Sequence, residues 1–446
     1  SMKKAIIIFF LFGITFSNAQ FKSEPEIFTL EQCIETALRY NYDIQLYSAQ
    51  MRSNTADVTA AFGDFLPSLN FYMGYNRQLN SQGVKTLNIG GQNIPIQATD
   101  PNSYSMSASA AYIIFNGFSN VANYKRAQES FNAQYLTLNQ TQNKVKLDVY
   151  RQFIDVIRKS QIIKIRQSNL ELGQKELEHI QAQVDAGTKP ITFLYTQQAE
   201  LGNREYELVI SENDFNISKT TLLYTMGLNT ANQVEFSESS LPTNIDSNDV
   251  QQFRLNIGGF NGALNTALQS RIDISATKSS ITAAESNITI AESGYFPTLA
   301  ASGGWSWSNS QLANFGDNGR TYVGLQLSVP IFDNFNSNLR IQNAKVQLKQ
   351  KELELNQVEQ NIRTNVKTAM QSIDASEKQL NITKRALFAA EQNYESMSER
   401  FRVGSSSLTD LLSANNQLIT AQINRINSIY YYFQIQKEML YAIGKL

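Results

Sequence analysis

The sequence predicts an α+β membrane protein in which a long antiparallel coiled-coil barrel of α-helices continues into a transmembrane β-barrel. Three observations carry this prediction. Two proline-free segments of 68 residues have the length of very long helices, four short segments alternate apolar and polar residues, and the two halves of the chain repeat each other. Only four strands come from each chain, so the barrel must be closed between several copies.

The composition excludes several classes of function. The 446 residues carry 38 Lys and Arg against 39 Asp and Glu, a net charge of −1, which provides no basic surface for nucleic acid. One cysteine, Cys33, and one histidine, His179, leave no disulfide framework and no multi-histidine or thiolate metal site. We therefore predict a protein that is not an enzyme and has no cofactor, with Cys33 as a buried apolar residue.

The start of the chain has the pattern of an export signal. Lys3 and Lys4 precede an apolar run over residues 5–16, and small residues end at Ala19. This pattern predicts a signal peptide over residues 1–19. No later segment reaches 18 uninterrupted apolar residues, so we expect any later membrane crossing to use strands.

Self-comparison divides the chain into two structural repeats. Residues 65–69 (FLPSL) match residues 295–299 (YFPTL), and residues 115–227 match residues 332–444 in one continuous register. We predict a first repeat over 20–230 with the order helix, two strands, long helix, tip turn and helix, and a second repeat over 261–446. The linker, 231–260, is rich in Asn, Ser and Gly and is expected to form an equatorial belt.

The long helices are predicted over residues 119–186 and 336–403, where apolar residues recur with heptad-like spacing. At about 1.5 Å per residue, each would be roughly 100 Å long. Gly187 and Gly404 then end the two helices, and the chain doubles back into shorter helices over 190–226 and 408–443. Helices over 29–64 and 261–293 supply the remaining length, so two short helices should stack end to end beside each long one.

The strands are predicted over residues 68–77, 104–113, 299–307 and 322–329, within the barrel segments 66–115 and 296–332. Apolar and polar residues alternate over about ten residues, which is typical of transmembrane barrels. A half-buried sheet in a soluble domain is the alternative. Because an eight-stranded barrel fills with side chains, three or four copies fit a conducting tube best. Trp305 and Trp307 are expected to face lipid as membrane anchors.

Short strings recur in a fixed order along the whole mature chain: LPSL at 66–69, IIFNG at 113–117, AGT at 186–188, FPTL at 296–299, PIFD at 330–333 and VGS at 403–405. In this order the sequence resembles the TolC-like outer membrane efflux proteins. The resemblance implies a homotrimer with a 12-stranded barrel among the lipids of the outer membrane of a Gram-negative bacterium, continued by a helical tunnel into the periplasm. It also implies a passive exit duct of a tripartite efflux pump or type I secretion system, conducting small molecules or proteins. The partners would be a periplasmic adaptor and an inner-membrane pump such as an RND or ABC transporter.

The resemblance also implies functional residues at the two helix tips. The tips would dock the adaptor through Ala186, Gly187, Thr188, Val403, Gly404 and Ser405. Asp410 matches an acidic position that rings the tunnel entrance and favours cations, although a carboxylate there also suits the first turn of a helix. The family's second acidic position is Ser413 here, its gate-linking tyrosine and arginine positions are Phe401 and Ser406, and Phe193 replaces a gate aspartate of some members. We therefore predict an apolar constriction at Phe401 and Phe193 instead of a charged latch.

A second class of function fits part of the same pattern. A secreted or surface-bound trimeric adhesin or structural fibre would also use long helices, with the strands only as a trimerisation head and with no pore. The sequence names neither the cargo nor the cognate pump.

Overall fold

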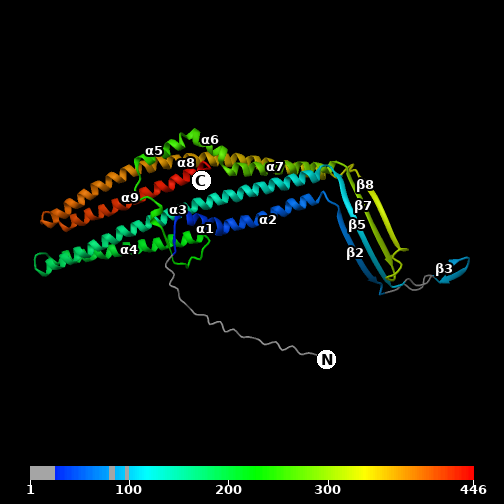
Figure 1. The fold of residues 1–446 in the computed structure, drawn as a ribbon, viewed down its shortest axis with the longest axis horizontal. Helices are drawn as coiled ribbons and strands as arrows, with labels where there is room; N and C mark the ends of the chain where they lie inside the picture. Colours follow the sequence, from blue (N-terminus) through cyan, green and yellow to red (C-terminus); the bar gives the residue numbers. More distant parts are fainter. Residues whose placement is uncertain (1–25, 80–85, 96–99) are drawn as a thin grey trace, which may run out of the picture.

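The computed structural model describes residues 26–79, 86–95 and 100–446, and the predicted signal peptide over 1–19 lies outside them. The described residues form an elongated molecule (Figure 1), in which helices run side by side along most of the length and a sheet extends from one end. Among these residues no helix is both long enough and apolar enough to cross a membrane.

Two long helices set the length of the molecule. Helix α3 (Ser119–Asp185) and helix α8 (Asn336–Arg402) have 67 residues each, and the return helices α4 (Ile191–Thr225) and α9 (Leu408–Ala442) have 35 each. The predicted long and return helices are therefore confirmed, with ends that differ by a single residue. Each long helix packs against its return helix as an antiparallel pair (Figure 1).

The first predicted short helix is wrong as a single element, because it breaks at Asn41 into α1 (Leu30–Tyr40) and α2 (Tyr42–Gly63). The Asn41 side chain accepts hydrogen bonds from the backbone N–H groups of Asp43 (2.9 Å) and Ile44 (3.3 Å), which caps α2. Its amide also donates to the carbonyl of Thr225 at the end of α4, at 2.8 Å. The break is thus the place where α4 ends against the α1–α2 pair, and α2 and α4 together cover the length of α3 (Figure 1).

The second predicted short helix breaks in the same way, at Arg271, into α6 (Phe260–Ser270) and α7 (Ile272–Glu292). Arg271 is buried, its guanidinium pairs with Asp273 at 2.5 Å, and it lies 5.4 Å from the ring centre of Tyr441 on α9. Helices α7 and α9 therefore lie end to end between α3 and α8. A short 3₁₀ turn, η2 (Ser293–Tyr295), leads from α7 into the sheet.

The sheet contains four antiparallel strands in the order β2 (Ser68–Arg77), β5 (Asn102–Asn116), β7 (Thr298–Asn309) and β8 (Gly319–Ser328). Directly opposed residues share a face, and the row Leu69, Ala110, Gly303 and Val323 lies on the apolar one. The opposite face is lined by serines, among them Ser105, Ser107, Ser109, Ser302 and Ser306. The predicted alternation is therefore confirmed. A small hairpin of β3 (Thr86–Ile89) and β4 (Gln92–Pro95) lies beyond the sheet (Figure 1).

Trp307 differs from its expected role as a lipid-facing anchor. It lies on the apolar face, but only 2% of it is exposed, because the loop after β7 folds over it. Its ring stacks on Phe315 with centroids 4.4 Å apart, and its indole N–H donates to the Asn314 carbonyl at 3.3 Å. Trp307 thus holds this loop in place, while Trp305 stays partly exposed on the same face.

The segment between the two halves packs on the middle of the helices. Strand β6 (Val234–Phe236) pairs in parallel with β1 (Glu26–Phe28), and η1 (Glu238–Ser240) and α5 (Ser247–Ile257) follow. Glu238 accepts hydrogen bonds from Ser160, Gln161 and Lys164, all on α3. On α5, Arg254 pairs with Asp374 and Glu377, both on α8. The segment is therefore fixed to both long helices.

Candidate functional site at the hairpin tips

The two helical hairpins turn back at the end of the molecule that lies far from the sheet (Figure 1). Gly187 has a φ of 71°, its N–H donates to the Val184 carbonyl, and the Thr188 N–H donates to the Gln183 carbonyl, both at 2.9 Å. This pair of bonds is a Schellman motif, which needs a left-handed residue at that position. Gly404 has a φ of 77° and ends α8 with the same pair of bonds. The predicted glycine caps are therefore confirmed.

The predicted docking residues of both tips are all exposed: Ala186, Gly187, Thr188, Val403, Gly404 and Ser405. Hydrogen bonds within each turn hold their backbone, and Ser405 also donates its hydroxyl to the Arg400 carbonyl at 3.2 Å. The tips are thus two rigid, exposed turns of similar shape.

One lysine joins the two hairpins. The Nζ atom of Lys189 lies 5.1 Å from the ring centre of Phe193 on α4 and 5.1 Å from that of Phe401 on α8. Beneath these rings Leu194 and Leu408 are buried in one apolar cluster. A cation over an aromatic face contributes about 0.5–1 kcal/mol at exposed sites. The structure thus brings the predicted gate residues Phe193 and Phe401 together, and Lys189, which sequence reasoning missed, lies next to the tip turn.

Asp410 caps the helix on which it lies. The Ser407 hydroxyl and backbone N–H donate to its carboxylate at 2.7 Å and 3.1 Å, and the Asp410 N–H donates to the Ser407 hydroxyl at 3.1 Å. This reciprocal arrangement is a capping box, and the two bonds from Ser407 lower the pKa of Asp410. The expected role in the first turn of a helix is confirmed. The side chain is also exposed, so its oxygens still face solvent.

The two predicted serine positions differ in their surroundings. Ser406 is partly buried and donates to the Met397 carbonyl at 3.4 Å, which ties the tip turn to its own helix. Ser413 is exposed, one turn after Asp410, and lines a groove of about 940 Å³ between α8 and α9. The groove also contains Gln417, which accepts a hydrogen bond from an amide across the groove, and its described lining carries no charged side chain. Neither serine belongs to the apolar cluster under Lys189.

A buried polar group that sequence reasoning missed lies between α3 and α4, close to the tips. The Arg204 side chain is 3% exposed and pairs with Glu176 (3.3 Å) and Glu200 (3.4 Å), and it donates to the Asn169 carbonyl at 3.0 Å. Burial raises the pKa of Glu176, and the charge of Arg204 opposes that shift. The one sequence signal was Gly173 within α3, because a Cβ atom there would lie 2.7 Å from the guanidinium.

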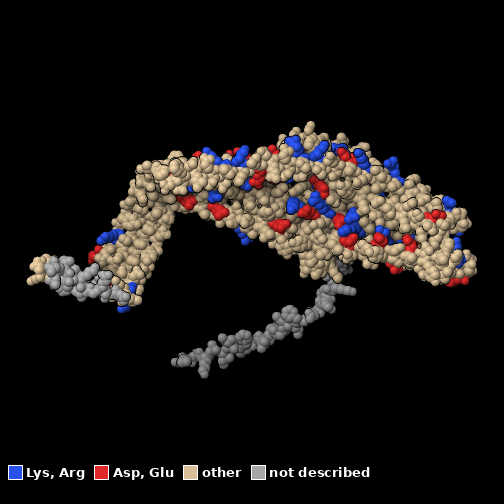
Figure 2. All heavy atoms as spheres, turned by 180° about the vertical axis from the view of Figure 1, so that it is seen from behind, with Lys and Arg blue, Asp and Glu red and all other residues tan. Residues whose placement is uncertain are grey.

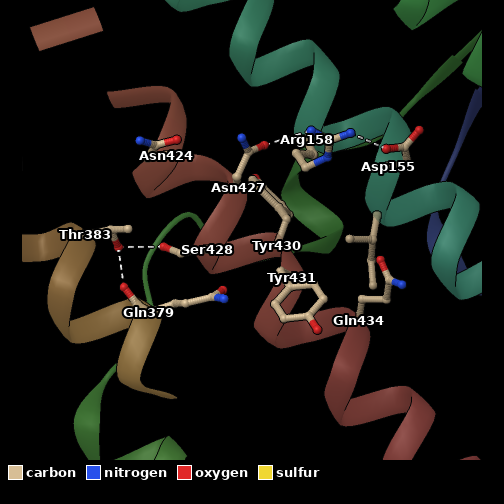
Figure 3. Close-up of a pocket in the computed structure, with 11 residues that line it drawn as sticks. Asp155, Arg158, Gln379, Thr383, Asn424, Asn427, Ser428, Tyr430, Tyr431 and Gln434 are labelled. Atoms are coloured by element: carbon tan, nitrogen blue, oxygen red, sulfur yellow. Dashed lines mark hydrogen bonds and ion pairs between the residues drawn. The ribbon is translucent and has the colours of Figure 1, made fainter. Parts of the chain in front are cut away.

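Farther from the tips, a pocket of about 540 Å³ opens between α3, α8 and α9 (Figure 3). Arg158 donates to Asp155 on its own helix at 2.5 Å and to Asn427 on α9 at 2.8 Å. The other polar side chains around the pocket are neutral: Gln379, Thr383, Asn424, Ser428, Tyr430, Tyr431 and Gln434. Figure 2 shows charges of both signs scattered over the helices, with no large surface of one sign among the described residues of this face. The pocket therefore offers many hydrogen-bonding groups, and its two charged side chains, Asp155 and Arg158, pair with each other.

The amino-acid sequence is similar to those of named outer membrane proteins. Residues 33–228 and 263–445 match the family model described as "Outer membrane efflux protein". The outer membrane efflux protein BepC of Brucella suis is 22% identical over 366 residues, which cover 80% of this chain and 76% of BepC. The outer membrane protein TolC of Vibrio cholerae is 23% identical over 413 residues, which cover 91% of this chain and 88% of TolC.

Two solved structures share the fold. The Campylobacter jejuni outer membrane channel CmeC is 17% identical with a TM-score of 0.77, and the match covers 93% of this chain and 85% of CmeC. The Vibrio cholerae outer membrane protein VceC is 16% identical with a TM-score of 0.75, and the match covers 93% of this chain and 96% of VceC. The chain therefore belongs to the outer membrane efflux protein family, a family of export ducts in the outer membrane of Gram-negative bacteria that extend into the periplasm.

Proposed function

We propose that three copies of this chain form a closed channel-tunnel, with a 12-stranded barrel in the outer membrane and a helical tunnel in the periplasm. The observation that carries the proposal is the pair of open sheet edges. Within the described residues, β2 and β8 each pair on one side only. Unpaired backbone groups are not tolerated in lipid, so each edge needs a strand from another copy.

The helices support the same assembly. The helices form one layer with two free sides. On the side of β2 the outermost helices are α2 and α4, which pack mainly on α3, and on the side of β8 the outermost helix is α8. Both sides carry apolar side chains that are more than half exposed: Tyr195, Tyr206, Val209, Ile217 and Tyr224 on α4, and Leu339, Val346, Leu353 and Ile382 on α8. Such stripes suit a neighbouring copy, with α4 of one chain against α8 of the next.

The division into repeats over 20–230 and 261–446, with a belt over 231–260, remains part of this proposal. It is supported by the equal lengths of α3 and α8 and of α4 and α9. The contacts of Glu238 with α3 and of Arg254 with α8 would hold such a belt in place.

The function proposed for the trimer is that of a passive exit duct in a tripartite efflux pump or type I secretion system. Its exposed tips would dock a periplasmic adaptor, and an inner-membrane pump such as an RND or ABC transporter would drive transport. The grooves between the helices are lined mostly by neutral amides and hydroxyls, which provide hydrogen bonds. The two charged side chains there, Asp155 and Arg158, pair with each other, so little net charge would retain cargo. Membership in the export family does not favour the alternative of a surface fibre without a pore.

The entrance of the duct would lie at the tips. Three copies of Asp410 would form an acidic ring that favours cations, and Ser413 would leave the next turn uncharged. Phe193 and Phe401, held by Lys189, would narrow the resting entrance. The test is single-channel conductance, which should rise in Phe401→Ala and stay unchanged in Phe388→Ala, an exposed position elsewhere on the same helix. An unchanged Phe401→Ala channel would contradict the constriction.

The assembly itself is tested by native mass spectrometry and bilayer conductance of the purified mature chain. We expect a trimer that conducts. Val209→Asp places a charge in the exposed apolar stripe of α4 and should shift the mass to that of the monomer. Thr420→Asp, in the polar groove between α8 and α9, is the control and should remain trimeric. A stable wild-type monomer, or a trimer that does not conduct, would overturn the proposal.

A further inference from the structure

We propose that a cavity between the two hairpins, just inside their tips, binds a small amphipathic anion. The cavity has a volume of about 350 Å³, at the lower end of the range of small-molecule sites (about 300–1,000 Å³). Its lining comes from both hairpins, because α3, α4, α8 and α9 each contribute side chains. The cavity and the groove that contains Ser413 have no lining residue in common, so they are separate spaces.

One side of the cavity is apolar. Its surface is formed by two leucines of α9 and by residues of α3 and α8: Leu172, Ile180, Phe401, Leu408 and Leu411, together with the ring of Tyr394. Leu408 and Leu411 are 5% and 6% exposed and so provide fixed walls. This surface suits an aromatic or aliphatic body, because burial of apolar area is the main source of affinity in such sites.

A buried acceptor in the lining lacks a partner. Gln197 is completely buried, and its amide N–H groups donate to Glu176 at 3.1 Å and to the Gly173 carbonyl at 3.5 Å. Among the described residues its carbonyl oxygen has no hydrogen-bond partner. An unsatisfied buried acceptor costs about 1–3 kcal/mol, so a ligand that brings an N–H or O–H donor gains by supplying the bond.

The charges around the cavity favour an anion. Lys175 and Lys189 line it and form no ion pair within the described part of the chain. The third cation, Arg402, pairs with Glu399, and the lining carboxylate, Glu176, is already paired with Arg204. His179 and Gln183 also line the cavity, and their side chains form a hydrogen bond of 3.0 Å with each other. Two ammonium groups without a carboxylate partner therefore remain for a carboxylate or sulfonate.

The ligand class follows from these three features: an apolar ring system, one hydrogen-bond donor and one anionic group. Because both hairpins contribute to the cavity, a bound ligand would tie one hairpin to the other. The cavity lies within a single chain, so binding depends neither on trimer closure nor on conductance.

The test uses 1-anilinonaphthalene-8-sulfonate, which has fused rings, one N–H and one sulfonate, and whose fluorescence rises in apolar sites. The full mature chain is titrated in nanodiscs, and empty nanodiscs of the same lipid are subtracted. We expect saturable binding at one site per chain. The double variant Lys175→Gln/Lys189→Gln should bind at least tenfold more weakly, and Ser398→Trp, which fills the cavity from its partly exposed rim, should abolish binding.

The matched control is Lys345→Gln/Lys384→Gln, which removes two exposed lysines of α8 outside the cavity and should leave the affinity unchanged. Partition of the probe into lipid only, seen as no saturable signal above the empty nanodiscs, would overturn the proposal. Equal affinity of the wild type and Ser398→Trp would also overturn it. A wild-type chain that binds the probe but does not conduct would contradict only the proposed duct.

Discussion

Replacing Gly227 by alanine is expected to force the end of α4 away from the α1–α2 break. Gly227 follows α4 with a φ of 71°, in the left-handed region. A Cβ atom there would lie 2.1 Å from the Tyr40 carbonyl oxygen and 3.1 Å from the Asn41 backbone nitrogen. Both neighbours are backbone atoms, so no side-chain rotation can relieve the contact.

The expected loss of stability has two parts. A non-glycine residue in the left-handed region costs about 1–2 kcal/mol. The clash with fixed backbone adds a cost like that of overpacking a core, about 1–3 kcal/mol. Gly187→Ala separates the two parts, because Gly187 has the same φ of 71° but a Cβ atom added there would meet no other atom within 4 Å. Gly227→Ala should therefore lose more stability than Gly187→Ala by the second part alone.

Thermal unfolding followed by far-ultraviolet circular dichroism in detergent measures this difference. We expect Gly187→Ala to have the highest Tm of three variants and Gly227→Ala the lowest. Gly444→Ala should lie between them, because a Cβ atom at Gly444 would lie 3.0 Å from the Ser270 carbonyl. A Gly227→Ala protein as stable as Gly187→Ala would refute the reasoning that close stacking of helix ends fixes this junction.

Three other predictions rest on buried or capped groups. Cys33 is fully buried and burial raises its pKa to about 12, so N-ethylmaleimide should label it only on unfolding; rapid labelling of the native chain would contradict this burial. Arg204→Met leaves buried carboxylates unpaired and should lower the free energy of unfolding by about 3–5 kcal/mol. Adding Glu176→Gln to this variant should restore part of the loss in a double-mutant cycle. Additive losses in the cycle would argue against the pairing of Arg204 with Glu176. The pKa of Asp410 is lowered in the folded chain, so its stabilising effect is complete above the ordinary value of 3.8 and is lost as the pH falls through the lowered pKa. Asp410→Asn should therefore be less stable than the wild type at neutral pH, and denaturant titrations should show the difference vanish in acid; a constant difference would contradict the cap.

The long elements could be predicted from the sequence because local periodicity determines them. A proline-free heptad pattern predicted both long helices to within one residue, and the alternation over 68–77 matches β2. The breaks at Asn41 and Arg271 could not be predicted in this way. Each break lies where the end of another helix contacts it. Asn41 donates to the Thr225 carbonyl at the end of α4, and Arg271 lies over the ring of Tyr441 near the end of α9. Such contacts join residues far apart in the sequence.

The candidate site shows the same division. The glycine caps and the capping box at Asp410 are local motifs, and both were visible in the sequence. Lys189 was missed because its partner Phe401 belongs to the other hairpin, more than two hundred residues away. Trp307 was assigned to the correct face, but its burial depends on Phe315 in a loop with no regular pattern.

The unbroken 67-residue helices restrict how the distance from the sheet to the hairpin tips can be changed by deletions or insertions. Seven residues correspond to about two turns and about 10 Å, so a deletion keeps the packing seam aligned only in steps of that size. Each deletion in α3 must be matched in α8 and in the shorter helices beside it, or the tips would no longer end level with each other; these helices are α4 and α9 near the tips and α2 and α7 near the sheet. The distance from the sheet to the tips is therefore adjustable only in steps of about 10 Å that all the neighbouring helices make together.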